Sequence, residues 1–167
     1  MSSSPATDRG RGTLVSEVMT VGVLTVKPTQ DVDAAVDIIV DRVITGVPVV
    51  DDDGVCIGIV SESDVLSKHG NTVADVMTAG VISVEDDATL EEATEIMLTR
   101  RIRRLPVLHD GKLVGILTRA DVLRRVRTTH WVCEWCKAAE RGVRPPNACP
   151  SCGGESWQLT VEERDPA

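Results

Sequence analysis

The chain of 167 residues contains an internal repeat that covers most of its length. The segment VSEVMTVGVLTV at 15–26 matches VADVMTAGVISV at 73–84, an offset of 58 residues. Further along, GVPVVDDDGVCIGIVSESDVL at 46–66 matches RLPVLHDGKLVGILTRADVL at 104–123, with one residue deleted. A repeated unit of this kind completes its apolar face against a neighbouring copy. We therefore expect two similar units that pack as a pseudo-symmetric pair and share a core.

Each copy has the same order of predicted elements. A short helix carrying Val-Met-Thr leads into a β-rich run, at Val23–Val26 in the first copy and at Val81–Val84 in the second. An amphipathic helix follows, then two apolar strands joined by a turn, then a final short helix. The apolar positions of the amphipathic helices recur every three or four residues: Val32, Ala35, Val36 and Ile39; Leu90, Ala93, Ile96 and Met97. This order predicts an α/β (α+β) fold built from two β-α-β-β-α repeats.

Residues that can cap helices mark the predicted helix starts. Asp31 precedes the first amphipathic helix, and Thr89 with Glu92 forms a capping-box pattern before the second. The final helix of each copy begins at a Ser/Thr-x-x-Asp step, Ser61–Asp64 or Thr118–Asp121. The chain has no Phe or Tyr, so the core of the repeats must consist of small and medium aliphatic side chains and Met.

The repeats contain no recognisable catalytic constellation. The three histidines are isolated in the sequence, and no Ser or Cys lies in a nucleophile motif. The carboxylates of 51–53 lie in the turn between two strands, where a solvated turn is a better explanation than a metal site. Cys56 lies in the apolar run VCIGIV and is predicted to be a buried small hydrophobe. These features favour a binding module and not an enzyme.

Several short motifs occur twice in the same order. They are Met-Thr after the first helix, Gly-Val-Pro-Val and Arg-Leu-Pro-Val in the first apolar strand, Gly58 and Gly115 in the second, and both Ser/Thr-x-x-Asp steps. Together they resemble the CBS-domain family, present as a tandem pair (a Bateman module), over about residues 13–127. The resemblance implies a regulatory protein that commonly forms a homodimer and acts on a partner protein, whose identity the sequence does not give.

The resemblance also implies a ligand. Paired CBS repeats form two clefts that commonly hold AMP, ADP or ATP, with ribose hydroxyls donating to the Asp of Ser/Thr-x-x-Asp. The corresponding residues are Asp64 and Asp121, with Ser61 and Thr118 near the sugar–phosphate. A carboxylate at a helix start can accept from two vicinal hydroxyls at once. The positions of the aliphatic walls that hold adenine in the family are Val23, Val81 and Ile82.

Basic residues distinguish the two copies. In nucleotide-sensing relatives, basic residues just before the strand proline hold phosphates, and the second copy offers Arg103 and Arg104 there. Arg119 adds a third cation, whereas Glu62 at the same place in the first copy would repel a phosphate. We expect one strong nucleotide site and one weak or empty site. The family's clefts are composite, so one interpretation joins Asp64 to Arg103 and Arg104; the alternative makes the arginines a solvated helix end or a dimer contact.

Four of the five cysteines lie near the C-terminus, as Cys133-Glu-Trp-Cys136 and Cys149-Pro-Ser-Cys152, with 12 residues between the pairs. Two C-x-x-C knuckles at this spacing are typical of a tetrahedral four-thiolate metal site. The second knuckle resembles those of zinc ribbons and rubredoxins, which implies Zn, with Fe fitting the same geometry. Lys137 stands where that family usually has Gly, which predicts a less regular first turn. The alternative, two disulfides, is disfavoured in a reducing compartment.

Three roles remain open for the predicted zinc ribbon: scaffolding or partner recognition, nucleic-acid binding, and redox sensing. Residues 128–167 carry four basic and six acidic side chains, and the whole chain has a formal net charge of -8. This balance disfavours nucleic acid as a partner, so scaffolding or partner recognition is preferred. In the alternative function, a nucleic-acid-associated or redox-sensing ribbon protein uses the CBS pair mainly as a dimerisation scaffold.

The predicted organisation follows from these boundaries. It comprises a disordered leader at 1–12, CBS repeats at 13–68 and 69–127, a zinc ribbon at 128–162 and a tail at 163–167. The leader is polar and lacks the apolar segment of a signal peptide. No apolar run approaches the roughly 18 residues that span a bilayer. A cytoplasmic location, without membrane contact, is therefore the prediction.

Overall fold

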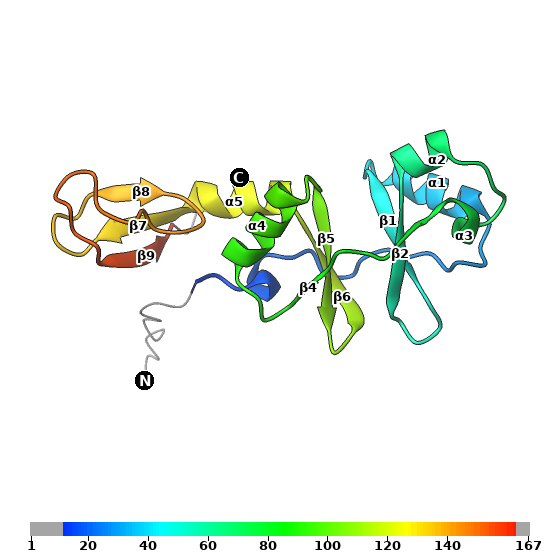
Figure 1. Ribbon diagram of the computed structural model, residues 1–167, viewed down its shortest axis with the longest axis horizontal. Helices are drawn as coiled ribbons and strands as arrows, with labels where there is room; N and C mark the ends of the chain where they lie inside the picture. Colours follow the sequence, from blue (N-terminus) through cyan, green and yellow to red (C-terminus); the bar gives the residue numbers. More distant parts are fainter. Residues whose placement is uncertain (1–11, 163–167) are drawn as a thin grey trace.

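The computed structural model describes residues 12–162, and three units follow one another along its long axis (Figure 1). The first repeat lies at one end, the second repeat in the middle and the four-cysteine unit at the other end. The predicted leader at 1–12, apart from its last residue, and the predicted tail at 163–167 lie outside the described residues. Within residues 12–162, no helix has the length and apolar character needed to cross a membrane.

The two repeats contain corresponding helices and hairpins in the same order, as the sequence repeat predicts, and the second has two additional short strands where the first has isolated bridges at Thr20 and Val26. The elements of the first are η1 (Val15–Glu17, a 3-10 helix), α1 (Val32–Asp41), β1 (Gly46–Val50), β2 (Cys56–Ser61) and α2 (Glu62–Ser67). Those of the second are α3 (Val73–Val76), β3 (Thr78–Ala79), β4 (Val84–Glu85), α4 (Leu90–Thr99), β5 (Arg104–His109), β6 (Lys112–Thr118) and α5 (Arg119–Thr128). The pairs β1–β2 and β5–β6 are antiparallel hairpins, so the mixed α/β fold is confirmed.

The first helix of each repeat packs into the other repeat. Val15 of η1 belongs to the buried cluster of the second repeat, whereas Val73 and Val76 of α3 belong to the cluster of the first. The chain after each helix pairs in the same crossed way, because Thr20 bridges Ile116 of β6 and β3 pairs with β2. The structure therefore has two aliphatic cores, each completed by a segment of the other repeat, and not the single shared core that we expected.

Two glycines in the strands make room for this exchange. Gly58 of β2 lies against Met77, whose Sδ would be only 2.8 Å from a Cβ at that position. Gly115 of β6 lies against Met19 in the same way, and the carbonyl oxygen of Thr20 would be 3.1 Å from its Cβ. In each repeat the strand glycine thus contacts the Met-Thr motif of the other copy, at the point where the two chain segments cross.

The β-rich runs predicted at Val23–Val26 and Val81–Val84 are mostly irregular. Only the last residue of each run joins a sheet, as a parallel partner of β1 or β5. A glycine with positive φ precedes each run, Gly22 at 68° and Gly80 at 74°. This left-handed conformation redirects the backbone, so the following residues do not continue a hydrogen-bonded ladder.

The helix starts agree with the sequence prediction. Asp31 accepts a hydrogen bond from a backbone N–H of α1, and Thr89 forms a capping box with Glu92 before α4. The steps Ser61–Asp64 and Thr118–Asp121 form the same box before α2 and α5. Each box ties the Asp carboxylate to the last residue of the preceding strand.

The third unit is a small sheet with the strand order β8-β7-β9. Its strands are β7 (Thr129–Cys133), β8 (Ala139–Arg141) and β9 (Trp157–Val161). The last residue of α5 is directly followed by the first residue of β7, so no loop separates this unit from the second repeat. The small β-rich C-terminal unit predicted from the cysteine spacing is confirmed.

Candidate ligand cavity and metal centre

A cavity of about 680 Å³ lies between the two repeats, beside the start of α5. Part of its wall is aliphatic and is formed by Val23, Leu24, Val43, Ile44, Pro48 and Ile116. Another part is basic and is formed by Arg42, Arg103, Arg104, Arg119 and Arg124. No Asp, Glu or Lys occurs among the described residues that line it. Of the five guanidinium groups in the wall, that of Arg124 is paired with Asp121 behind the wall, and that of Arg104 lies near Glu62.

The cavity brings together half of the predicted ligand residues: Val23, Arg103, Arg104, Thr118 and Arg119. Asp121 lies behind this wall, in hydrogen-bond contact with two lining residues. The other predicted residues are not among the lining set: Ser61, Asp64, Val81 and Ile82. In this cavity Arg103 and Arg104 therefore lie with the second Ser/Thr-x-x-Asp step. The composite site that joins these arginines to Asp64 stays a prediction.

The capping box of α5 leaves one Asp121 oxygen facing the arginines. Oδ2 accepts from the backbone N–H of Thr118 at 2.8 Å and from its hydroxyl at 2.6 Å. Oδ1 accepts from Nη2 of Arg124. Asp121 is 5% exposed, whereas the Arg124 side chain is 65% exposed and lines the cavity. The buried Asp121 Oδ1 is thus covered, on the cavity side, by the exposed Arg124 guanidinium.

Arg104 reaches from the second repeat onto the backbone of the first. Its guanidinium lies over Gly46, at the start of β1, where a Cβ would overlap with Nη1 and approach the carbonyl oxygen of Val60 to 2.8 Å. Burial lowers the pKa of Arg104, the nearby Glu62 raises it, and Arg103 lowers it. The guanidinium is therefore partly desolvated, which strengthens its attraction for an anion.

Arg119 is held between the cavity and helix α4. Its Nη2 donates to the carbonyl oxygen of Met97 at 2.9 Å, near the C-terminal end of α4. Its Nε is buried and has no hydrogen-bond partner among the described residues. A buried donor without a partner is costly, and a ligand in the cavity could use this one only after the Arg119 side chain shifts.

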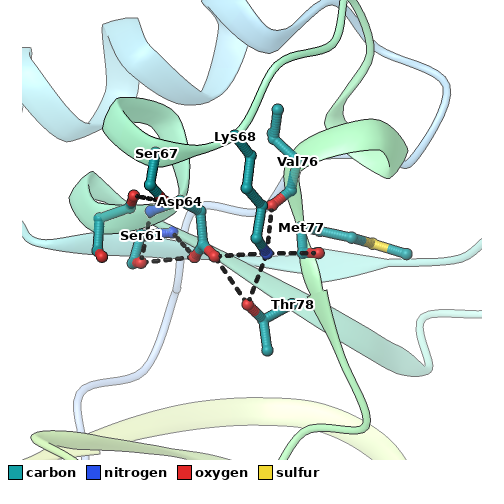
Figure 2. Close-up of polar contacts among 8 residues, drawn as sticks. Ser61, Asp64, Ser67, Lys68, Val76, Met77 and Thr78 are labelled. Carbon is teal, nitrogen blue, oxygen red and sulfur yellow. Dashed lines mark hydrogen bonds and ion pairs between the residues drawn. The ribbon is translucent and has the colours of Figure 1, made fainter.

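The matching Asp64 in the first repeat has a different environment (Figure 2). Asp64 Oδ2 accepts from the backbone N–H of Ser61 at 2.9 Å and also from its hydroxyl. Asp64 Oδ1 accepts from Lys68 Nζ at 2.7 Å and from the hydroxyl of Thr78 at 2.7 Å. Burial raises the pKa of Asp64, but the hydrogen bonds from Lys68, Ser61 and Thr78 outweigh it and lower the pKa to about 2.

The four predicted metal ligands come together in the C-terminal unit. The sulfur atoms of Cys133, Cys136, Cys149 and Cys152 all lie within 4.8 Å of one another. Cys133 Sγ is 3.7 Å from Cys152 Sγ, and Cys136 Sγ is 3.5 Å from Cys149 Sγ. Four thiolates at about 2.3 Å from a central zinc would be about 3.8 Å apart, so the arrangement fits a tetrahedral ion. All four are free thiols, which the disulfide alternative does not predict.

The two knuckles have matching turns, although one lacks the expected glycine. Lys137 N–H donates to the carbonyl oxygen of Cys133 at 3.0 Å, and Gly153 N–H donates to that of Cys149 at 2.8 Å. Lys137 has a φ of 62° and Gly153 a φ of 75°. The prediction of a less regular first turn is therefore wrong, because Lys137 adopts the left-handed conformation at a local cost in free energy.

The thiols of this cluster affect one another. Backbone N–H groups, first that of Cys136, lower the pKa of Cys133 to about 7. The backbone N–H of Gly154 lowers the pKa of Cys152, but the neighbouring thiols, first Cys136, raise it to about 12. One thiolate therefore forms readily and opposes the formation of others nearby, and a divalent cation is the group that would allow all four to ionise.

The C-terminal unit docks on α4. Val143 packs against the core of the second repeat, and Nη1 of Arg144 is 3.3 Å from Oε1 of Glu91. Trp131 is buried and its Nε1 donates to the carbonyl oxygen of Gly142 at 3.1 Å, whereas Trp135 is 72% exposed beside the cysteines.

Cys56, the fifth cysteine, lies outside this cluster and is only partly buried, which corrects the prediction of a fully buried residue.

Sequence reasoning missed Arg42, Arg124 and Lys68. Arg124 and Lys68 follow Asp121 and Asp64 by three and four residues, a spacing that places side chains on one face of a helix. That signal is visible in the sequence. Arg42 reaches the cavity because α1 ends there, and this follows only from the packing of the helix.

Comparison with known proteins agrees with this architecture. The CBS domain family matches residues 15–70 and 73–128. The chloroplastic CBS domain-containing protein CBSX2 of Arabidopsis thaliana is 34% identical over 134 residues, covering 59% of this chain and 56% of that protein. The chain thus spans little more than half the length of this relative.

Solved structures share the fold. A crystal structure of CBSX2 in complex with AMP is similar with a TM-score of 0.65 and 38% identity, covering 68% of this chain and 95% of that one. The CBS domain pair of protein MJ0100 in complex with 5′-methylthioadenosine and S-adenosyl-L-methionine gives a TM-score of 0.63 and 27% identity, covering 68% and 95%. Together with the two family matches, these likenesses show that the chain belongs to the CBS-domain family, with two CBS domains in tandem.

Proposed function

We propose that the chain is a regulatory module that binds AMP, ADP or ATP in the cavity beside α5 and communicates its bound state to a partner protein. One observation carries the proposal: a single cavity has an aliphatic wall and five arginines. Such a wall suits a ligand with a flat, weakly polar base at one end and several negative charges at the other.

The arginines suit phosphate groups in particular. Guanidinium groups form charge-assisted, bidentate hydrogen bonds with phosphate oxygens. Arg103 and Arg104 lie three and two residues before the proline of β5, and Arg119 and Arg124 lie in the first two turns of α5. The N-terminal end of this ten-residue helix adds a favourable potential for an anion.

The remaining walls suit the nucleoside. Val23, Pro48 and Ile116 can enclose the adenine ring without any aromatic side chain. Asp121 Oδ1 can accept from the ribose hydroxyls once Arg124 turns from the carboxylate to a phosphate. In this arrangement the ligand would replace one ion pair with two new interactions.

The ligands of the solved relatives point to the same class. CBSX2 is known in complex with AMP, and the MJ0100 pair in complex with 5′-methylthioadenosine and S-adenosyl-L-methionine. S-adenosyl-L-methionine carries a positive sulfonium, which five guanidinium groups would repel. The charge of this cavity therefore favours a phosphorylated adenosine.

Isothermal titration calorimetry with AMP, ADP and ATP tests the proposal. We expect binding by the wild type and at least tenfold weaker binding by the double variant Arg103→Ala/Arg104→Ala, since each lost charge-assisted contact is worth about 1.5–3 kcal/mol. Arg127→Ala, at the exposed end of α5 away from the cavity, is the matched control and should bind like the wild type. Absence of binding by the wild type, or unchanged binding by the double variant, would refute the proposal.

Further parts of the proposal concern the assembly and its setting. We infer a binding module and not an enzyme, a homodimer that regulates a protein partner, and a cytoplasmic location. The acidic balance of the chain supports a protein partner over nucleic acid. Size-exclusion chromatography with light scattering tests the dimer.

We further propose that the four cysteines hold a structural zinc ion. Support comes from the sulfur–sulfur distances and from the two matching turns. A closed set of four thiolates leaves no open position for a substrate, so the metal would supply stability to a small unit. Metal analysis of the purified protein should give one zinc per chain; a red protein containing iron would replace zinc with iron in the same site.

A further inference from the structure

The two Ser/Thr-x-x-Asp steps are built alike but end in different contacts. In both, the Asp is buried, at 8% exposed for Asp64 and 5% for Asp121, and its Oδ2 is tied to the capping residue. The difference lies at Oδ1. At Asp121 this oxygen meets the exposed Arg124, whereas at Asp64 it meets Lys68 and Thr78.

The Asp64 carboxylate has no free acceptor position. A carboxylate offers about four lone-pair sites. Four donors use them: the backbone N–H and hydroxyl of Ser61 at Oδ2, and Lys68 Nζ and the Thr78 hydroxyl at Oδ1. Figure 2 shows these contacts converging on the one carboxylate. A ribose hydroxyl could bind there only by displacing an existing donor.

The Lys68 ammonium is equally well satisfied. Besides Asp64, its Nζ contacts the carbonyl oxygen of Val76 at 2.9 Å, that of Met77 at 3.2 Å and the hydroxyl of Thr78 at 3.0 Å. The ammonium has three protons for these four acceptors. Lys68 therefore connects the end of α2 to the last residue of α3 and the two residues after it. These several contacts hold the Lys68 side chain in place (Figure 2).

The second repeat has a cation on the same oxygen, Arg124, but its side chain is 65% exposed and no residue at the position of Lys68 holds the carboxylate. Arg125 follows Asp121 by four residues, as Lys68 follows Asp64, but its guanidinium donates to the hydroxyl of Thr13, with Nη2 at 3.2 Å. The lysine contact is thus a property of the first repeat alone and not of the repeated fold.

We propose that Lys68 limits the protein to one nucleotide per chain, because its ammonium, together with the Thr78 hydroxyl that it also contacts, already occupies the Oδ1 acceptor positions at Asp64 that ribose hydroxyls take at Asp121. This inference rests on the proposed function, since it takes Asp121 as the carboxylate of the occupied site. Lys68 is then a specificity-determining residue, because it makes two Ser/Thr-x-x-Asp steps of common origin unequal. Glu62 follows Ser61 directly in the first step, where a carboxylate would oppose a phosphate.

Binding stoichiometry measured by calorimetry tests the inference with variants that leave Lys68 in place. Wild type should bind one ATP or AMP per chain. Asp121→Asn should weaken that binding at least tenfold, whereas Asp64→Asn should leave it within about twofold of the wild type. Loss of binding in Asp64→Asn with retention in Asp121→Asn would overturn the inference and leave the proposed function standing.

Removing the ammonium gives the second test. Lys68→Met keeps the aliphatic stem and removes the charge, and adenosine is the probe because Glu62 opposes a phosphate. We expect the stoichiometry for adenosine to rise from one to two per chain in Lys68→Met, to stay at one in Lys68→Arg, and to return to one in Lys68→Met/Asp64→Asn. Circular dichroism verifies that each variant is folded.

The outcomes separate the two proposals. Two equal sites in the wild type, or a folded Lys68→Met variant that still binds one adenosine, would refute the proposed role of Lys68 and leave the proposed function standing. Absence of binding of every nucleotide by the wild type would instead refute the proposed function. In that case a single adenosine gained by Lys68→Met would still locate a cleft at Asp64.

Discussion

Among single residues, Gly46 and Arg104 form the contact on which the shape of the cavity most depends. The guanidinium of Arg104 crosses from one repeat to the other and fills the space that a side chain at position 46 would need. Gly46 is buried at the start of β1 and has ordinary strand conformation, so the constraint is steric and not conformational. One small residue thus allows a cation of the second repeat to lie on the backbone of the first.

Gly46→Ala should therefore displace Arg104. The new Cβ would overlap with Nη1 and lie within 2.8 Å of a carbonyl oxygen, so we expect a loss in free energy of unfolding of about 1–3 kcal/mol together with weaker nucleotide binding. Urea unfolding and calorimetry measure the two effects. Gly12→Ala is the control, because its Cβ would meet nothing closer than 3.9 Å. Equal stability of the two variants would contradict the expectation.

Asp64 predicts a pH dependence of stability. Its pKa in the folded protein is about 2, below the ordinary value of 3.8, so the unfolded chain binds more protons between these values. The stabilisation, about 2 kcal/mol, is fully present above pH 3.8 and is lost as the pH falls towards 2. The difference in free energy of unfolding between wild type and Asp64→Asn should shrink accordingly on acidification. Urea unfolding as a function of pH measures it, with Asp53→Asn in an exposed turn as the control.

The residue-level predictions from sequence succeeded where the interaction is local. The Ser/Thr-x-x-Asp steps and Thr89–Glu92 were recognisable because a capping box spans only four residues. That Arg103 and Thr118 line the same cavity was not recognisable, because it depends on how two repeats are rotated against each other. Lys68 was within reach of sequence reasoning, but its contacts to Val76 and Met77 join separate helices.

At the level of secondary-structure elements, the exchange of η1 and α3 between the repeats explains why both copies are needed. Each buried cluster contains a helix from the other repeat, so neither repeat buries its own core alone. The sequence identified these helices and their order correctly. It could not show the exchange, because a periodic apolar pattern states which face is buried but not which neighbour buries it.

Gly115→Ala tests the crossing. The added Cβ would overlap with Met19 and lie 3.1 Å from the carbonyl oxygen of Thr20, so we expect a loss of about 1–3 kcal/mol in free energy of unfolding. Met19→Ala alone should also destabilise, by removing a packed side chain. If the two residues face each other, the double variant should lose less than the sum of the single variants. Strictly additive losses in a double-mutant cycle would contradict this contact.

In the whole molecule, α4 and α5 both extend from the cavity to the C-terminal unit. Arg119 at the start of α5 bonds to Met97 near the end of α4, while Glu91 at the start of α4 pairs with Arg144 of the C-terminal unit. The end of α5 runs directly into β7, whose last residue is Cys133. The cysteine spacing predicted that the four cysteines cluster, but not that the C-terminal unit packs on α4, because the contacts of Val143 and Arg144 have no sequence signature.

Metal removal should unfold the C-terminal unit and leave the CBS pair folded. Its strands are short and its core small, and binding energy on the order of 10 kcal/mol supplies the stability of comparable sites. After treatment with a chelator, limited proteolysis should cleave within residues 129–161 and spare residues 13–127, as mass spectrometry would show. Cys56→Ser, outside the cluster, should behave like the wild type; simultaneous unfolding of all three units would contradict the expectation.

The position of the three tryptophans has a practical consequence. All lie in the C-terminal unit, and the chain has no tyrosine or phenylalanine, so intrinsic fluorescence arises from this unit alone. No tryptophan is among the described residues that line the cavity beside Asp121, so a nucleotide bound there would touch none of these indoles. Any change in emission on adding the ligand would therefore be optical evidence that the cavity and the four-cysteine unit are mechanically linked, obtained without attaching a dye.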